Sequence, residues 1–209
     1  MKAIIFSLLG WMFLPVMDGF AKFLSADLPI LQITWARYFF TVVFTLPIMF
    51  FFFNKQLVWS DKPKLQILRG LILLSANICF FYSISIISLA KALTLAFIAP
   101  LIVTAFSPLF LGEKFGFRRW TAVIIGFIGS LVVIRPGFLE LNIASLAALC
   151  TGFFYGFYLI ITRKLSTSDN PLLTLLMTGL VGAILVSSVI PFYWVKPTLN
   201  PVSYTHLRA

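Results

Sequence analysis

The chain has 209 residues, of which 61% are hydrophobic and only 11% are charged, and its mean hydropathy is +1.05. Soluble domains carry about a quarter charged residues, so this composition excludes an ordinary water-soluble fold and indicates a membrane protein. The formal net charge is +10, but a basic nucleic-acid binder would gather Lys and Arg on one water-facing surface. Here they are dispersed among short connections, so we expect no nucleic-acid partner.

Seven apolar segments are candidate membrane spans, and most are close to the ~20 residues that cross a ~30 Å hydrocarbon core. In chain order they are 4–24, 30–53, 68–88, 92–111, 119–135, 142–162 and 172–195. The third and fourth form one stretch interrupted only by Lys91, which is too long for a single span at 1.5 Å per residue. We therefore expect a tight turn near Ser88–Lys91, and an all-α polytopic membrane protein.

The basic residues are concentrated in every second connection. One set of connections holds Lys2, Lys55, Lys62, Lys64, Arg69, Lys114, Arg118, Arg119, Arg163 and Lys164; the other holds only Lys91, Arg135 and Lys196. Cytoplasmic loops of membrane proteins carry the excess of Lys and Arg. Ten against three predicts a cytoplasmic N-terminus, with the connections at Asp27, Lys91 and Glu140 outside.

Segment 7–47 can be laid over segment 145–191 at an offset of about 140 residues, because helix, short Ser/Asp/Pro turn and helix recur in the same order. Five spans separate the two starts, and an odd number inverts the second copy in the membrane, as in many secondary carriers. We expect a first five-span unit at 4–137 and the start of an inverted unit at 142–196. Residues 197–209 resemble read-through, so we expect a reading frame cut short, inactive alone unless a second copy pairs with it as a homodimer.

Several motifs carry a family resemblance. They are Leu89-Ala90-Lys91-Ala92, Phe97-Ile98-Ala99-Pro100-Leu101, Leu111-Gly112-Glu113-Lys114, Gly126-Phe127-Ile128-Gly129 and Val133-Ile134-Arg135-Pro136-Gly137. Together they resemble the first half of drug/metabolite transporter superfamily members with EamA domains, in which a proline lies mid-span in the fourth helix, Leu-Gly-Glu closes that helix and Arg-Pro-Gly closes the fifth.

The resemblance implies two inverted five-helix units, ten spans in the full-length family, and a carrier in the bacterial cytoplasmic (inner) membrane. Within the superfamily, the chain is most similar to the group containing bacterial S-adenosylmethionine uptake carriers. This similarity is carried by Asp18 and Lys22 in the first helix and by Gln32 and Arg37 in the helix that follows.

Charged residues inside spans are the first candidates for a substrate pathway, because such residues usually face a bundle interior or a wet cavity. Asp18 and Lys22 are one helical turn apart and can pair; Asp18 could instead bind a cationic group or a coupling proton. Arg37 lies about 12 Å into its span. It could hold an anionic part of the substrate, pair with Asp18, or be a fixed partner of Gln32 or of backbone carbonyls.

Other candidates are polar or small. Pro100 frees a carbonyl in the fourth span, which indicates either a kink on the substrate side or a structural bend. Polar groups expected near a cavity are Asn77, Tyr82, Ser83, Ser85, Thr94 and Thr104, although Ser and Thr in membrane helices often bond their own backbone. Gly152 with Gly156, and Gly126 with Ser130, are small-xxx-small pairs that favour close helix packing. Glu113 is expected to orient the cytoplasmic turn after Gly112.

The spans contain no His, no paired carboxylates and no nucleophile or metal constellation, which argues against an intramembrane enzyme. No cofactor, metal or catalytic residue is expected. The favoured hypothesis is a secondary carrier of a small polar metabolite, such as an amino-acid or nucleoside derivative, working by alternating access in the lipid bilayer. A membrane scaffold without transport activity is the alternative, but it would not need Asp18 and Arg37 inside the membrane.

Overall fold

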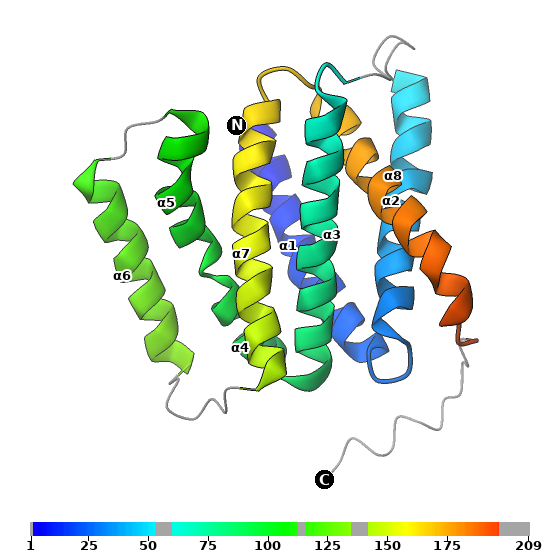
Figure 1. Cartoon of the computed structure of the whole chain (residues 1–209), viewed down its shortest axis with the longest axis horizontal. Coiled ribbons are helices and arrows are strands. Elements are labelled where there is room, and N and C mark those ends of the chain that lie inside the picture. The colour runs from blue at the N-terminus through cyan, green and yellow to red at the C-terminus, as the bar shows by residue number, and fades with distance from the viewer. Residues whose placement is uncertain (1, 53–59, 113–115, 135–141, 197–209) are drawn as a thin grey trace.

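The computed structural model describes residues 2–52, 60–112, 116–134 and 142–196, and all regular structure in these ranges is helical. The elements run α1 Lys2–Leu24, α2 Ile30–Phe52, α3 Pro63–Ile86, α4 Leu89–Ala96, α5 Ala99–Leu111, α6 Phe117–Ile134, α7 Ile143–Leu165 and α8 Pro171–Val189, followed by a 3-10 turn at Ile190–Phe192. They form a bundle of roughly parallel and antiparallel rods (Figure 1). Helices suit an apolar solvent because every backbone hydrogen bond is made within the segment.

Each of the seven predicted spans overlaps helix in the described residues. Five described segments are long and apolar enough to cross a bilayer: 30–51, 63–86, 89–111, 143–165 and 171–192. A shorter apolar helix covers 120–129, within the fifth predicted span at 119–135. The predicted turn between the third and fourth spans is also present, since α3 ends at Ile86 and Ser88 caps α4 by accepting a hydrogen bond from the backbone N–H of Lys91 at 3.4 Å.

The third span begins earlier than predicted, and this corrects the assignment of Arg69 to a loop. Pro63 occupies the first turn of α3, where its missing N–H costs nothing. Arg69 is therefore already in the second turn, and only 4% of its surface is exposed. Removing Arg69 from the sequence count leaves nine basic residues against three, so the bias that indicates orientation is retained.

The fourth span is two helices separated at Phe97 and Ile98. Pro100 lies in the first turn of α5, and its nitrogen cannot donate to the carbonyl four residues earlier, on Ala96. The two glycines of α7 pack at this break. A Cβ on Gly152 would clash with Ile98 and lie 2.6 Å from the Ala96 carbonyl oxygen, and one on Gly156 would lie 2.7 Å from Ile102. The predicted close packing at this pair is confirmed.

Gly126 behaves differently from the α7 pair. No atom of the described residues lies within 4 Å of a Cβ built on it, so Gly126 does not pack closely against them. The side chain of Ser130, the other member of the predicted pair, lies outside the described ones. At the end of α5, Gly112 adopts the left-handed conformation (φ 68°) and its N–H bonds to the carbonyl of Pro108. Glycine ends a helix in this way at little steric cost.

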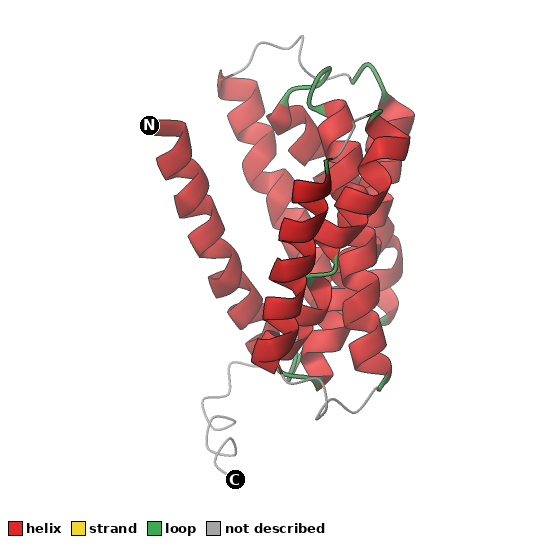
Figure 2. Cartoon of the chain, turned by 90° about the vertical axis from the view of Figure 1, so that its left-hand side faces the viewer, coloured by secondary structure: helices red, strands yellow, loops and turns green. Residues whose placement is uncertain are grey.

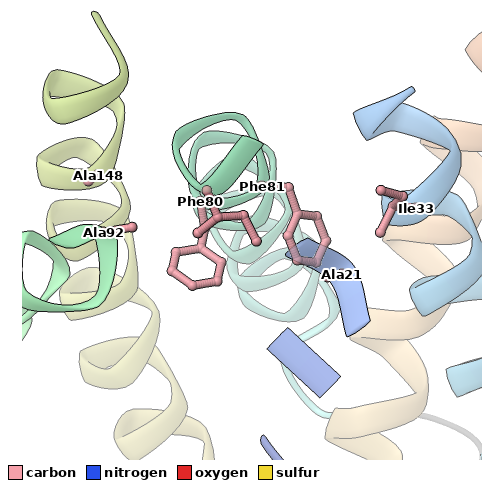
Figure 3. Close-up of a cluster of buried hydrophobic side chains, with 7 residues drawn as sticks. Ala21, Ile33, Phe80, Phe81, Ala92 and Ala148 are labelled. Carbon is pink, nitrogen blue, oxygen red and sulfur yellow. The ribbon is translucent and has the colours of Figure 1, made fainter. Parts of the chain in front are cut away.

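The core is built from helices that are distant in sequence, with α7 packed along α3 and α8 along α2 (Figure 1). One buried cluster joins five helices: Ala21 of α1, Ile33 of α2, Phe80, Phe81 and Ile84 of α3, Ala92 of α4 and Ala148 of α7 (Figure 3). Helix α1 meets the bundle only near its C-terminal end, and its N-terminal half lies apart (Figure 2). Met12 and Phe13 are accordingly 70% exposed.

Candidate functional site

A pocket of about 620 Å³ lies between α1 and α2, beside Phe81 of α3. It is lined by Met17, Phe20, Ala21, Leu24, Leu28, Gln32, Ile33, Trp35, Ala36, Arg37, Phe40, Thr41, Phe44, Phe81 and Trp194. Its size falls within the range of small-molecule sites, which are mostly apolar with a few placed polar groups. Two of the predicted pathway residues, Gln32 and Arg37, are therefore in its wall.

Arg37 is half-buried, and its guanidinium carbon lies 5.8 Å from the centre of the Phe81 ring. The Thr41 hydroxyl donates a hydrogen bond to the backbone carbonyl of Arg37 at 2.7 Å. This bond involves the main chain of Arg37 and not its guanidinium. Among the described residues, the guanidinium has this ring contact but no hydrogen bond and no ion pair. Its donors are available to a ligand.

Asp18 is half-buried on α1 and interacts electrostatically with Arg37, without an ion pair within 4 Å among the described residues. The predicted partnership of Asp18 with Lys22 is wrong. Lys22 Nζ donates to the carbonyls of Ile84 and, at 3.2 Å, Ile87. The last carbonyls of a helix have no partner within it and carry partial negative charge, so the end of α3 attracts the ammonium away from its own helix.

Tyrosines extend the polar environment across the bundle. Asn77 of α3 donates to the hydroxyl of Tyr38 of α2 at 2.6 Å, and Tyr38 is 3% exposed. The rings of Tyr155 and Tyr158 on α7 stack with centroids 5.4 Å apart. Arg37 and Asp18 lie close enough to Tyr155, and Arg37 and Arg69 close enough to Tyr38, for their charges to act on these hydroxyls. We call Asp18, Arg37, Tyr38, Asn77, Tyr155, Tyr158 and Arg69 the central polar tract.

Arg69 lies at the end of this tract, where four hydrogen bonds join its guanidinium on α3 to α7 and α8. Its Nε donates to Thr162 at 2.7 Å, its Nη2 to the Tyr158 hydroxyl at 2.8 Å, and its Nη1 to the Thr174 carbonyl at 3.0 Å and to the Thr178 hydroxyl. The guanidinium also lies over the Tyr158 ring, 4.6 Å from its centre. Neutral oxygens thus disperse the charge, and α3, α7 and α8 are joined through one side chain.

Asp169, in the turn before α8, makes a second link between α3 and the start of α8, at the basic end of the bundle. It is buried and accepts hydrogen bonds from Ser60 and, at 2.6 Å, from Gln66 of α3. Burial alone would raise the pKa of the Asp169 carboxyl. Hydrogen bonds from Ser60, Gln66, Ser168 and the backbone of Asp61 outweigh burial and hold that pKa below its usual range, so the carboxylate is ionised.

The remaining candidates are mostly engaged with the backbone. The Gln32 amide donates to the carbonyl of Val195 at 2.9 Å and accepts from its N–H at 3.1 Å. Thr94 and Thr104 donate to carbonyls one turn earlier, at 3.0 and 2.8 Å. Tyr82 is half-buried and Pro100 is exposed, and neither lines the pocket. The motif residues Glu113, Arg135, Pro136 and Gly137 lie outside the described residues.

Sequence reasoning missed Arg69 and Asp169 as members of a buried cluster, and it did not single out Tyr38, Tyr155 or Tyr158. A signal for Arg69 existed, since proline at position 63 is typical of the first helical turn and places Arg69 well inside a helix. The tyrosines had no comparable signal in a chain so rich in aromatic residues. Their importance follows from helix pairing, which hydropathy does not report.

The fold and the buried charges define a polytopic all-α membrane protein with a pocket between its first two helices. Residues 1–135 match the EamA-like transporter family, so the chain belongs to that family. No solved structure matches the chain.

Several similar proteins of named function are transporters. The chain is 26% identical to an S-adenosylmethionine uptake transporter of Rickettsia bellii over 91% of this chain and 67% of that protein. It is 26% identical to a riboflavin transporter of Vibrio cholerae over 75% of this chain and 53% of that protein, and 27% identical to a pseudopaline exporter of Pseudomonas aeruginosa over 74% and 54%. The chain spans 61–67% of the length of the S-adenosylmethionine transporters it matches.

Proposed function

We propose that the protein takes part in moving a small polar organic metabolite across the membrane as a secondary carrier, with the α1–α2 pocket and the central polar tract as its substrate path. The observation that carries the proposal is Arg37, whose guanidinium faces a pocket inside a membrane span with no hydrogen-bonded partner among the described residues. A charge in a span costs ~3 kcal/mol on insertion scales and marks a substrate or ion path by default.

Family membership and the relatives named as transporters of S-adenosylmethionine, riboflavin and pseudopaline support the same class. These metabolites are organic and polar, in line with the amino-acid or nucleoside derivative expected from the sequence. The same names favour a carrier over an enzyme or a passive scaffold.

The proposed architecture is a first unit at 4–137 and an inverted second unit that begins at 142–196, with the substrate site where the units meet. The contact of α2 with α8 and of α3 with α7 supports this placement, because each pair takes one helix from either segment. The proposed membrane is the bacterial inner membrane, with a cytoplasmic N-terminus. A homodimer in which a second copy of the chain completes the site is the other arrangement that the same helices would allow.

Uptake into vesicles tests the proposal. The purified chain, which can pair with a second copy in the vesicle membrane, is reconstituted and supplied with a panel of radiolabelled zwitterionic and anionic metabolites. Uptake is followed for the unmodified protein and for Arg37→Gln. The expected result is saturable uptake of one substrate class, reduced at least tenfold by Arg37→Gln and unchanged by Arg118→Gln, which alters an exposed residue at the start of α6. Normal uptake by Arg37→Gln would show that Arg37 is a structural residue.

A further inference from the structure

The wall of the α1–α2 pocket is strongly aromatic. Six of its fifteen residues carry rings: Phe20, Trp35, Phe40, Phe44, Phe81 and Trp194. An aliphatic wall would suffice to exclude water, whereas aromatic faces and edges favour stacked or edge-to-face contact with another ring, by ~0.5–1.5 kcal/mol beyond the buried area. The composition of the wall therefore selects for flat, unsaturated ligands.

Trp35 is a fixed element of this wall. Its indole N–H donates to the hydroxyl of Ser187 on α8 at 2.9 Å. Its ring is stacked on Phe39 at 4.7 Å and meets Trp194 edge-on at 5.6 Å. A ring held on several sides loses little conformational entropy when a ligand arrives.

Of the polar side chains in the wall, only Arg37 is charged, and its donors are left to bind a ligand. The Gln32 amide is occupied at both ends by Val195, and the Thr41 hydroxyl by the Arg37 carbonyl. Arg37 remains, with a planar guanidinium that suits two-pronged binding of a carboxylate or phosphate. Phe40, which is 51% exposed, lies three residues after Arg37 on α2 and lines the same pocket. Residues three apart are neighbours on a helix surface, so one ligand can touch a ring and the charge together.

A lipid is a poorer occupant of the pocket. Arg37 is the eighth residue of α2, roughly 10 Å along the helix from its first residue, whereas lipid phosphates stay at the bilayer surface. An acyl chain could cover the aromatic side chains but would leave the guanidinium without a hydrogen bond in an apolar setting, which is costly.

We propose that the α1–α2 pocket is a subsite for an aromatic ring bearing an anionic group, with the ring against Trp35 and Phe40 and the anion on Arg37. This inference rests on the proposed function, because it names the substrate class of the same pocket. About 620 Å³ accommodates one to three fused rings with a short acidic substituent.

Direct binding to the 209-residue chain in phosphatidylcholine nanodiscs tests the inference, with quenching of tryptophan fluorescence as the readout. Three probes separate the contributions: 4-nitrobenzoate has ring and charge, 4-nitrobenzyl alcohol has the ring alone, and cyclohexanecarboxylate, which competes against 4-nitrobenzoate, has the charge alone. We expect saturable binding of 4-nitrobenzoate, roughly tenfold or more tighter than either other probe. Trp35→Phe should reduce the quenching, and the part that remains should come from Trp194 in the same wall.

Arg37→Gln should weaken 4-nitrobenzoate at least tenfold and leave 4-nitrobenzyl alcohol unchanged, while Arg118→Gln should change neither. The ranking of the three probes on the unmodified chain needs no variant and so does not depend on how Arg37→Gln folds. Equal affinity for all three, or no saturable binding because lipid fills the pocket, would overturn the inference. Tight 4-nitrobenzoate binding without uptake of any metabolite would defeat the carrier proposal alone, and uptake with equal probe affinities would defeat the subsite alone.

Discussion

The same substitution, glycine to alanine, should change stability in opposite directions at two positions. In a helix interior, Ala is favoured over Gly by ~0.8–1 kcal/mol. At Gly126, where no atom of the described part of the chain lies within 4 Å of the new Cβ, this gain should be observed almost in full. At Gly152 the new Cβ would clash with Ile98 and sit 2.6 Å from the Ala96 carbonyl oxygen, and a backbone oxygen cannot turn aside as a side chain can.

Overpacking of this kind typically costs ~1–3 kcal/mol, occasionally more, which outweighs the gain in helix propensity. At ~2–4 °C per kcal/mol for a chain of this size, Gly152→Ala should lower the melting temperature by several degrees, and Gly126→Ala should raise it by about 1–4 °C. Unfolding in detergent can be followed with a thiol-reactive dye, since Cys79 and Cys150 are both half-buried. A Gly152→Ala protein as stable as the parent would refute the close approach of α7 to the break between α4 and α5.

Three further outcomes are expected. Arg69→Lys should lower the melting temperature by about 2–6 °C, because an ammonium cannot reproduce a planar fork that bonds three helices, and Arg118→Lys should not change it; equal shifts would contradict the reasoning. The lowered pKa of Asp169 contributes stability that is present above its unfolded value of 3.8 and is lost as the pH falls through the folded pKa. Asp169→Asn should therefore be less stable at neutral pH, with the difference from the parent shrinking below about pH 4; a constant difference would show that the charge is not responsible. In a cysteine-free background, an impermeant maleimide should label Asn142→Cys from outside the cell and Lys62→Cys only after permeabilisation, and the reverse would invert the proposed orientation.

Hydropathy locates the spans because it measures what the bilayer itself selects, namely length and apolarity. It places the third and fourth spans with a turn between them, and α3 and α4 meet at that turn. It could not show that Arg69 is buried, since the second residue of the predicted span 68–88 is expected at the membrane boundary, whereas α3 begins at Pro63. The residues that form the site were only partly predictable, because their burial depends on contacts between helices.

Arg37 and Gln32 could be found because polar groups in an apolar run stand out, and both line the pocket. The partner of Lys22 was missed because spacing along one helix reports only neighbours on that helix, whereas the carbonyls at the end of α3 compete for the ammonium in three dimensions. Tertiary pairing between distant helices is the information that a single sequence does not display.

Pro15 lies in the middle of α1 and removes one hydrogen bond from the helix there. The part beyond Pro15 supplies every α1 residue that lines the pocket, and Lys22 fastens it to α3. Just before Pro15, Met12 and Phe13 are largely exposed, so these two side chains pack little against the rest of the bundle. A bend at Pro15 would therefore change the direction of the preceding residues of α1 without moving the part that lines the pocket, because Lys22 holds that part against α3.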